Sequence, residues 1–370
     1  MNPPVHSPDP APGDRADGSA ARRRGRRAQA YRGVANAGAG AVLIVLTTIS
    51  LTIGCAAIHE HQARNRVQRG DTLLAAEELD AALAEFQAAA EIAPQMAVVH
   101  SRLGVIYRRL GAYEQAIEAF VEAIRLNPFS FDDTFNLAQL YQFTNRLKDA
   151  IQAYLHAAEI EPASFDTQLN LGTCYQQAGD FTLATERFQK AIDIDPNRPH
   201  AYVNLGVALN AQRKYYDAIR AYKDALERDS RQPMVLVNLA HTYMQQDRLK
   251  MARQSLEQAI RMDPGLAAAH EALGFCQFRM REYDAAQQAY ERAVACDSRL
   301  PRSHAGLGSI HMLRYVEDTS RTDLRDRGLE CWHRSLELEP DQPRIRKLLA
   351  TYTPSRPDPE NALLDEGGAR

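Results

Sequence analysis

Four asparagines recur at one constant interval in the middle of the chain: Asn136, Asn170, Asn204 and Asn238. A carboxamide carries both a hydrogen-bond donor and an acceptor, so it can pair with a peptide backbone without reading that peptide's side chains. Further polar residues follow them by three or six positions: Gln139, Gln142, Gln176, Asn210 and His241. The pattern predicts a groove that binds a protein or peptide partner. The alternative is that these asparagines make hydrogen bonds between the helices of the protein itself.

The histidines and cysteines show no catalytic pattern. His304 and His311 are seven residues apart, and His59 and His61 flank Glu60, but neither set matches a metal triad or a nucleophile with its base. The HExxH, phosphate-loop and GxSxG patterns are absent, and the five cysteines form no CxxC. The sequence therefore predicts no enzyme activity, no metal site and no cofactor. A formal net charge of -3 with scattered Arg and Lys gives no reason to expect nucleic acid.

The elements that position the asparagines follow from a repeat of about 34 residues. A glycine or alanine recurs at this spacing: Gly70, Gly104, Ala138, Gly172, Gly206, Ala240, Gly274 and Gly308. In each of the first seven units two alanines follow at fixed places, with a large apolar or aromatic residue between them, as Ala82, Phe86 and Ala89 show in the first. Proline closes five units, at Pro94, Pro128, Pro162, Pro196 and Pro264. Small residues let two antiparallel helices approach closely, and proline stops the second helix. A single hairpin cannot bury its apolar face, so the hairpins must stack.

This pattern resembles the tetratricopeptide repeat, over residues 63–342. The resemblance implies an all-α, right-handed superhelical solenoid of about eight helix-turn-helix repeats. A capping helix is expected at 343–353 and a disordered tail at 354–370. From Gly308 to Pro340 the last repeat is longer than the same stretch from Gly104 to Pro128, which predicts a lengthened turn near 314–328.

Several recurring residues are predicted to pack inside this solenoid. His100, His270 and His304 share one place in the repeat, and Cys174 and Cys276 share another, two residues beyond the repeated glycine. Trp332 takes the aromatic place of the last repeat. The histidines are expected to pack between repeats, and the two thiols and Trp332 are expected to be core residues.

The asparagine run resembles the ladder in the O-GlcNAc transferase superhelix, where the family implies that asparagines grip the backbone of extended protein substrates. The resemblance covers the repeats only, because no stretch is left for a glycosyltransferase domain. Four hydrogen bonds of about 1 kcal/mol each correspond to about millimolar affinity, so neighbouring side chains must add the rest. Chaperone-binding members of the repeat family use a lysine clamp. This chain has no lysine at the site three residues before the glycine, which disfavours chaperone tails as partners.

The N-terminal segment sets the expected compartment. Residues 1–34 contain seven arginines against three aspartates and are predicted to be disordered. Residues 35–58 lack charged side chains throughout, and this stretch is long enough for a transmembrane helix or signal anchor. Because the arginines precede this segment, the N-terminus is expected in the cytoplasm and the repeats outside it, in a bacterial periplasm.

A second interpretation concerns Cys55. The run Leu51-Thr52-Ile53-Gly54-Cys55 resembles a bacterial lipobox, which implies a lipoprotein acylated at Cys55. A cleaved secretory signal is the third option, and all three place the repeats outside the cytoplasm. We therefore expect a membrane-tethered scaffold or adaptor that binds protein segments in its concave groove. The alternative is a lipoprotein that assists envelope, secretion or pilus assembly, and self-association through exposed repeat faces is a further option.

Overall fold

The computed structural model describes residues 58–353. The predicted segments 1–34 and 354–370, Cys55 and all but the last residue of 35–58 lie outside the described residues. Within 58–353 all regular secondary structure is helical, so the prediction of an all-α repeat solenoid is confirmed. In this part of the chain, no helix combines the length and the apolar character that a bilayer crossing requires.

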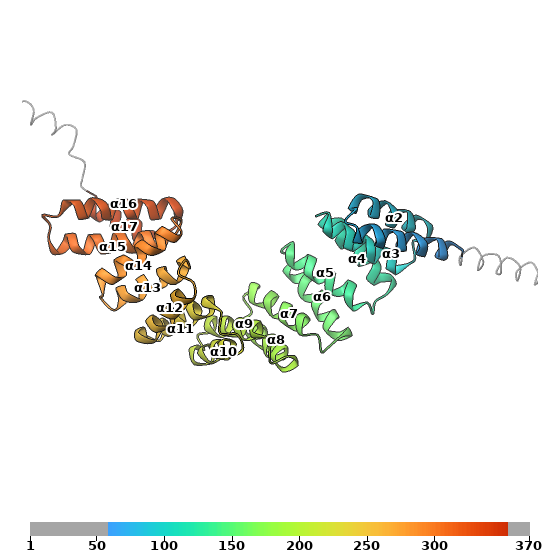
Figure 1. The fold of residues 1–370 in the computed structure, drawn as a ribbon, viewed down its shortest axis with the longest axis horizontal. Helices are drawn as coiled ribbons and strands as arrows, with labels where there is room; N and C mark the ends of the chain where they lie inside the picture. Colours follow the sequence, from blue (N-terminus) through green and yellow to red (C-terminus); the bar gives the residue numbers. More distant parts are fainter. Residues whose placement is uncertain (1–57, 354–370) are drawn as a thin grey trace, which may run out of the picture. The chain divides into compact units, whose positions relative to one another are not determined.

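The chain divides into two compact units, Met1–Pro128 and Phe129–Arg370. The first unit holds two helical hairpins (Figure 1). Its helices are residues 58–75, α2 (Leu79–Ile92), α3 (Ala97–Arg109) and α4 (Tyr113–Leu126).

The second unit holds six hairpins and one further helix. Its helices are α5 (Phe131–Phe143), α6 (Leu147–Ile160), α7 (Phe165–Gln177), α8 (Phe181–Ile194), α9 (Pro199–Ala211), α10 (Tyr215–Arg228), α11 (Pro233–Gln245), α12 (Leu249–Met262), α13 (Ala267–Arg279), α14 (Tyr283–Cys296), α15 (Pro301–Glu317), α16 (Thr322–Leu338) and α17 (Pro343–Tyr352). Each odd-numbered helix up to α15 pairs with the next helix along the chain, and each hairpin packs on its neighbour.

The repeated glycine brings the two helices of a hairpin together. A Cβ added to Gly172 would lie 2.6 Å from the ring of Phe188, and one added to Gly206 would lie 2.6 Å from the ring of Tyr222. Both rings are buried. Glycine is therefore needed because the aromatic side chain of the second helix already occupies the space that a side chain at this place would fill.

In several hairpins, a side chain with a ring, near the start of the first helix, makes a hydrogen bond to the turn that closes the preceding hairpin. In each case a side-chain donor reaches the backbone oxygen six residues earlier: His100 Nε2 to Pro94 at 2.8 Å, Tyr202 Oη to Pro196 at 3.2 Å, His270 Nε2 to Pro264 at 3.0 Å and His304 Nε2 to Ser298 at 3.1 Å. A carbonyl oxygen only accepts, so the histidine Nε2 or the tyrosine hydroxyl donates. The three histidines thus have the predicted packing role, and each also satisfies a turn carbonyl.

The last hairpin corrects one prediction. Helices α15 and α16 have 17 residues each, against 13 in α13 and 14 in α14, and the turn between them spans only 318–321. The lengthened turn expected near 314–328 is wrong, because most of the extra residues extend both helices. About four residues make one helical turn, so adding a turn to each helix keeps their facing sides in register.

The end of the second unit is closed by α17. Ile345 and Leu349 of this helix pack against Met312 and Trp332. Trp332 is 1% exposed, and its Nε1 donates to the backbone oxygen of Ala305 at 3.2 Å. Trp332 is therefore a core residue, as predicted, and α17 covers apolar side chains that the last hairpin would otherwise expose.

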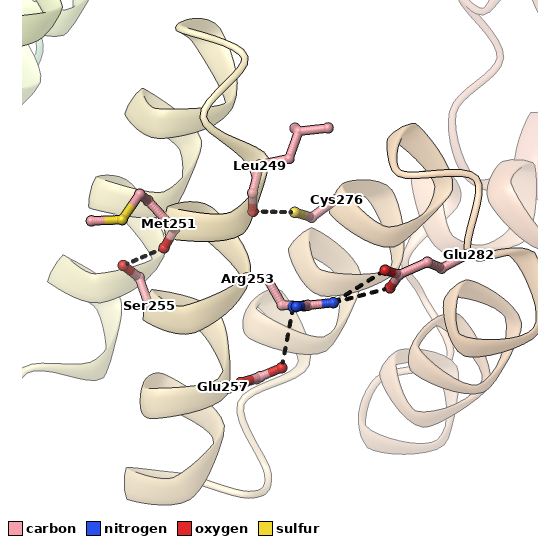
Figure 2. Close-up of polar contacts among 7 residues, drawn as sticks. All are labelled: Leu249, Met251, Arg253, Ser255, Glu257, Cys276 and Glu282. Carbon is pink, nitrogen blue, oxygen red and sulfur yellow. Dashed lines mark hydrogen bonds and ion pairs between the residues drawn. The ribbon is translucent and has the colours of Figure 1, made fainter.

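Polar contacts also tie consecutive hairpins together (Figure 2). Arg253 on α12 lies 3.7 Å from Glu257 on the same helix and 3.1 Å from Glu282, which directly precedes α14. The buried Cys276 thiol on α13 donates to the backbone oxygen of Leu249 at 3.4 Å, and burial raises its pKa. Cys276 thus serves the contact between hairpins, as expected of a core thiol.

Candidate functional site

The first helices of the hairpins form the inner wall of the second unit. Each of α7, α9, α11 and α13 contacts the next first helix along the chain. Within residues 129–353 the second helices make no comparable contacts with one another, so the first helices lie closer together. Asn136, Asn170, Asn204 and Asn238 stand at the same place on α5, α7, α9 and α11.

Two of the four asparagines are engaged inside the protein. Asn136 Nδ2 donates to the backbone oxygen of Asp132 on its own helix at 2.8 Å. The amide of Asn170 donates to the hydroxyl of Tyr154, which in turn donates to Gln142 Oε1 at 3.0 Å. Burial raises the pKa of Tyr154, so this hydroxyl stays protonated and keeps both bonds. For Asn170 the structure supports the alternative of an internal hydrogen bond.

The carboxamides of the other two asparagines are free to bind a partner, as far as the described residues show. Asn204 and Asn238 are half-buried, and neither side chain has a hydrogen-bond partner within residues 58–353. Asn210 lies further along α9, and its Oδ1 accepts from the Thr242 hydroxyl at 3.3 Å. That bond links α9 to α11 and holds the two helices that carry the open carboxamides.

The remaining predicted polar residues lie along the same helices. Gln139 is half-buried on α5, and Gln176 on α7 has an Oε1 atom that is buried without a partner in the described part of the chain. His241 on α11 is exposed. Surrounding protein atoms partly desolvate it and Arg302 on α15 repels its charge, so both lower the pKa of His241. Near pH 7 His241 is therefore neutral and offers one donor and one acceptor, like the carboxamides.

Sequence reasoning missed two residues of this wall. Phe275 on α13 is 48% exposed although it is aromatic, and Arg302 acts on His241 from two hairpins away. Phe275 directly follows Gly274 as His241 directly follows Ala240, so the place in the repeat could have identified it. Nothing in the sequence pattern relates Arg302 to His241, because that proximity depends on how three hairpins stack.

Within residues 58–353, no group of three or more His, Cys, Asp or Glu side chains is placed so that it could hold a metal ion. The wall is instead a surface of neutral hydrogen-bonding groups. It can hold polar backbone through paired donors and acceptors.

The sequence matches the family described as the Cilia and flagella-associated protein 70 C-terminal domain over residues 45–305, most of its length. The chain belongs to this family. The helical hairpins of this tetratricopeptide-type family are the elements described above, and the predicted repeat class is confirmed. A search of curated proteins finds no significant match.

Solved structures show the same fold at low sequence identity. The C-terminal part of a tetratricopeptide-repeat protein from Cytophaga hutchinsonii is 20% identical, with a TM-score of 0.56 over 65% of this chain and 99% of that one. PilF of Pseudomonas aeruginosa is 21% identical, with a TM-score of 0.50 over 60% and 97%. The APC/C Cut9–Hcn1 hetero-tetramer is 15% identical, with a TM-score of 0.51 over 77% and 55%. Each likeness is one of fold.

Proposed function

We propose that this tetratricopeptide-repeat protein is a scaffold that holds an extended segment of a partner protein against the inner wall formed by α5, α7, α9 and α11. The observation that carries the proposal is the pair of open carboxamides, Asn204 and Asn238, at the same place on consecutive first helices. An extended backbone presents alternating donors and acceptors, which such carboxamides match. The tetratricopeptide-type family supports a protein-binding role.

The test compares two pairs of asparagines. A photo-crosslinking residue at Gln245, at the end of α11, captures the partner in cells, and the captured segment is then used for affinity measurements. Replacing both Asn204 and Asn238 by Ala removes two hydrogen bonds of about 1 kcal/mol each, which weakens binding roughly thirtyfold. Circular dichroism should show an unchanged melting temperature.

The matched control replaces Asn136 and Asn170 by Ala. Their amides already bond within the protein, so this pair should weaken binding much less and lower stability by about 1 kcal/mol through the loss of the Tyr154 bond. Equal binding losses for the two pairs, or unfolding of the Asn204 and Asn238 variant, would show that the wall does not hold a backbone in this way.

We further propose that residues 35–58 tether the scaffold to a membrane with the repeats outside the cytoplasm. Their uncharged sequence behind an arginine-rich segment supports this. The exposed Cys296 is a natural reporter of sidedness. A membrane-impermeant maleimide should label it in intact spheroplasts, whereas Cys296→Ser should remain unlabelled. Labelling that requires lysis would refute this orientation, and wild-type protein found in the soluble fraction would refute the tether.

The lipoprotein alternative rests on Cys55 and on the lipobox-like residues before it. It predicts that the chain incorporates labelled palmitate and that Cys55→Ala abolishes both this labelling and membrane sorting. Palmitate incorporation that survives the substitution would eliminate this alternative and leave the uncleaved membrane segment.

A further inference from the structure

Four hairpins place a ring against the preceding turn, and the hairpin of α7 and α8 is one of those that do not. At the position of His100, Tyr202, His270 and His304, the hairpin of α7 and α8 carries Gln168. In those four hairpins the ring donates to the turn carbonyl six residues earlier. The equivalent carbonyl here is that of Pro162, which accepts no hydrogen bond within the described part of the chain.

A cavity of about 420 Å³ that is largely open to solvent lies at this place. It opens between the second helices α6 and α8, over the start of α7, and so lies apart from the inner wall of first helices. Leu155, Ala158 and Ile194 line it with apolar surface, next to Pro162.

Two polar groups of the cavity wall are buried and unpartnered. Gln168 is only 4% exposed, and its Oε1 has no hydrogen-bond partner in the described chain. The same holds for Nε of Arg187, on α8. A buried carboxamide oxygen without a partner is unfavourable, so a ligand that donates a hydrogen bond to it would remove this penalty.

The charges around the cavity balance. Arg187 and Lys190 face it together with Glu159 and Asp193, so the two positive and two negative side chains favour no ligand charge. The chemistry that fits is a neutral, largely apolar group with one hydrogen-bond donor. In the next hairpin that group is Tyr202 itself, whose ring lies 3.9 Å from the guanidinium of Arg228. Arg187 can stack on an incoming ring in the same way.

We propose that this cavity binds an aromatic side chain bearing a ring N–H, namely a tryptophan of a partner polypeptide. The indole fills the place that other hairpins fill with their own ring, and its N–H donates to Gln168 Oε1 or to the Pro162 carbonyl. In four other hairpins the occupant of this place is a ring-bearing side chain of the protein itself, so an amino-acid side chain of a partner polypeptide is the occupant whose size and chemistry match. The site is independent of the asparagine wall.

The test uses fluorine NMR on the full chain with three probes. The first is a blocked Gly-Gly-Trp-Gly-Gly peptide with 5-fluorotryptophan, the second is the same peptide methylated at the indole nitrogen, and the third is free 5-fluoroindole. The fluorine signal of the first peptide should broaden on binding, and this broadening should saturate. The methylated peptide should bind about fivefold more weakly because one hydrogen bond is lost. Binding of free 5-fluoroindole without binding of the peptide would overturn the assignment of a polypeptide partner.

Variants at Gln168 locate the site. Gln168→Tyr supplies the ring internally, as Tyr202 does, and should abolish binding while leaving the circular dichroism melt unchanged or raised. Gln168→Met keeps the length but removes the acceptor, so it should bind the first peptide more weakly and discriminate less against methylation. If the tyrosine variant fails to fold, Gln168→Met still tests whether the peptide binds beside this residue. Equal binding of the peptide by wild-type and variant chains, or no broadening with wild type at millimolar peptide, would overturn the proposal.

Discussion

The hairpin of α7 and α8 and the hairpin of α9 and α10 are consecutive copies of one repeated pattern. Their cores are built in the same way. A Cβ added to Gly172 would lie 2.6 Å from the ring of Phe188, and a Cβ added to Gly206 would lie 2.6 Å from the ring of Tyr222. The contact that joins the two helices is therefore the same in both copies.

The two hairpins differ at two places outside that contact. Gln168 leaves a cavity where Tyr202 fills the equivalent space, and the amide of Asn170 is bonded to Tyr154 where Asn204 is open. Each hairpin thus exposes a different group: the first a cavity between second helices, the second a carboxamide on the inner wall. The repeated residues set how the helices approach, and the variable places decide what is available to a ligand.

The largest expected effect is common to both hairpins. Gly172→Ala and Gly206→Ala each force a methyl group into an aromatic ring, and we expect each to lower the free energy of unfolding by about 2–3 kcal/mol. Urea unfolding followed by circular dichroism measures this. Gly265→Ala is the control, because a Cβ there meets only Asp263 at 3.5 Å. A large loss in one hairpin alone would show that the cores are not equivalent.

The next prediction converts one hairpin into the other. Tyr202→Gln removes a ring that is 7% exposed together with its bond to Pro196, so we expect a loss of about 2 kcal/mol. The substitution should also open a second cavity, and the number of fluorotryptophan peptides bound per chain should rise from one to two. A stable variant that still binds one peptide would mean that the ring at this place does not determine the cavity.

The sequence was sufficient for the parts that depend on spacing alone. A constant repeat length with small residues at fixed places predicts hairpins, their stacking and the first helices that carry the asparagines. It was insufficient where a feature depends on three helices at once. The bond from Asn170 to Tyr154 and the cavity beside Gln168 both arise between neighbouring hairpins. The extra residues of α15 and α16 were placed in a turn because length alone does not distinguish a longer loop from two longer helices.

The smallest expected effect tests whether the two cores are interchangeable side chain by side chain. Cys174 in α7 is 0% exposed, and Ala208, 0% exposed, stands at the same place in α9. Burial raises the pKa of the Cys174 thiol to about 11, so it is protonated and apolar in character at neutral pH. Cys174→Ala should therefore lower the free energy of unfolding by only about 1 kcal/mol, the effect of a small cavity.

Cys276→Ala is the matched control for this substitution in urea unfolding. The Cys276 thiol donates to the Leu249 backbone oxygen, whereas Cys174 has no such bond in the described chain, so Cys276→Ala should be the more destabilising of the two. A loss above about 3 kcal/mol for Cys174→Ala would lie outside the range of a small cavity. It would mean that the side chains around α7 pack specifically against the Cys174 sulfur. The two hairpins would then differ in their cores as well as at their surfaces.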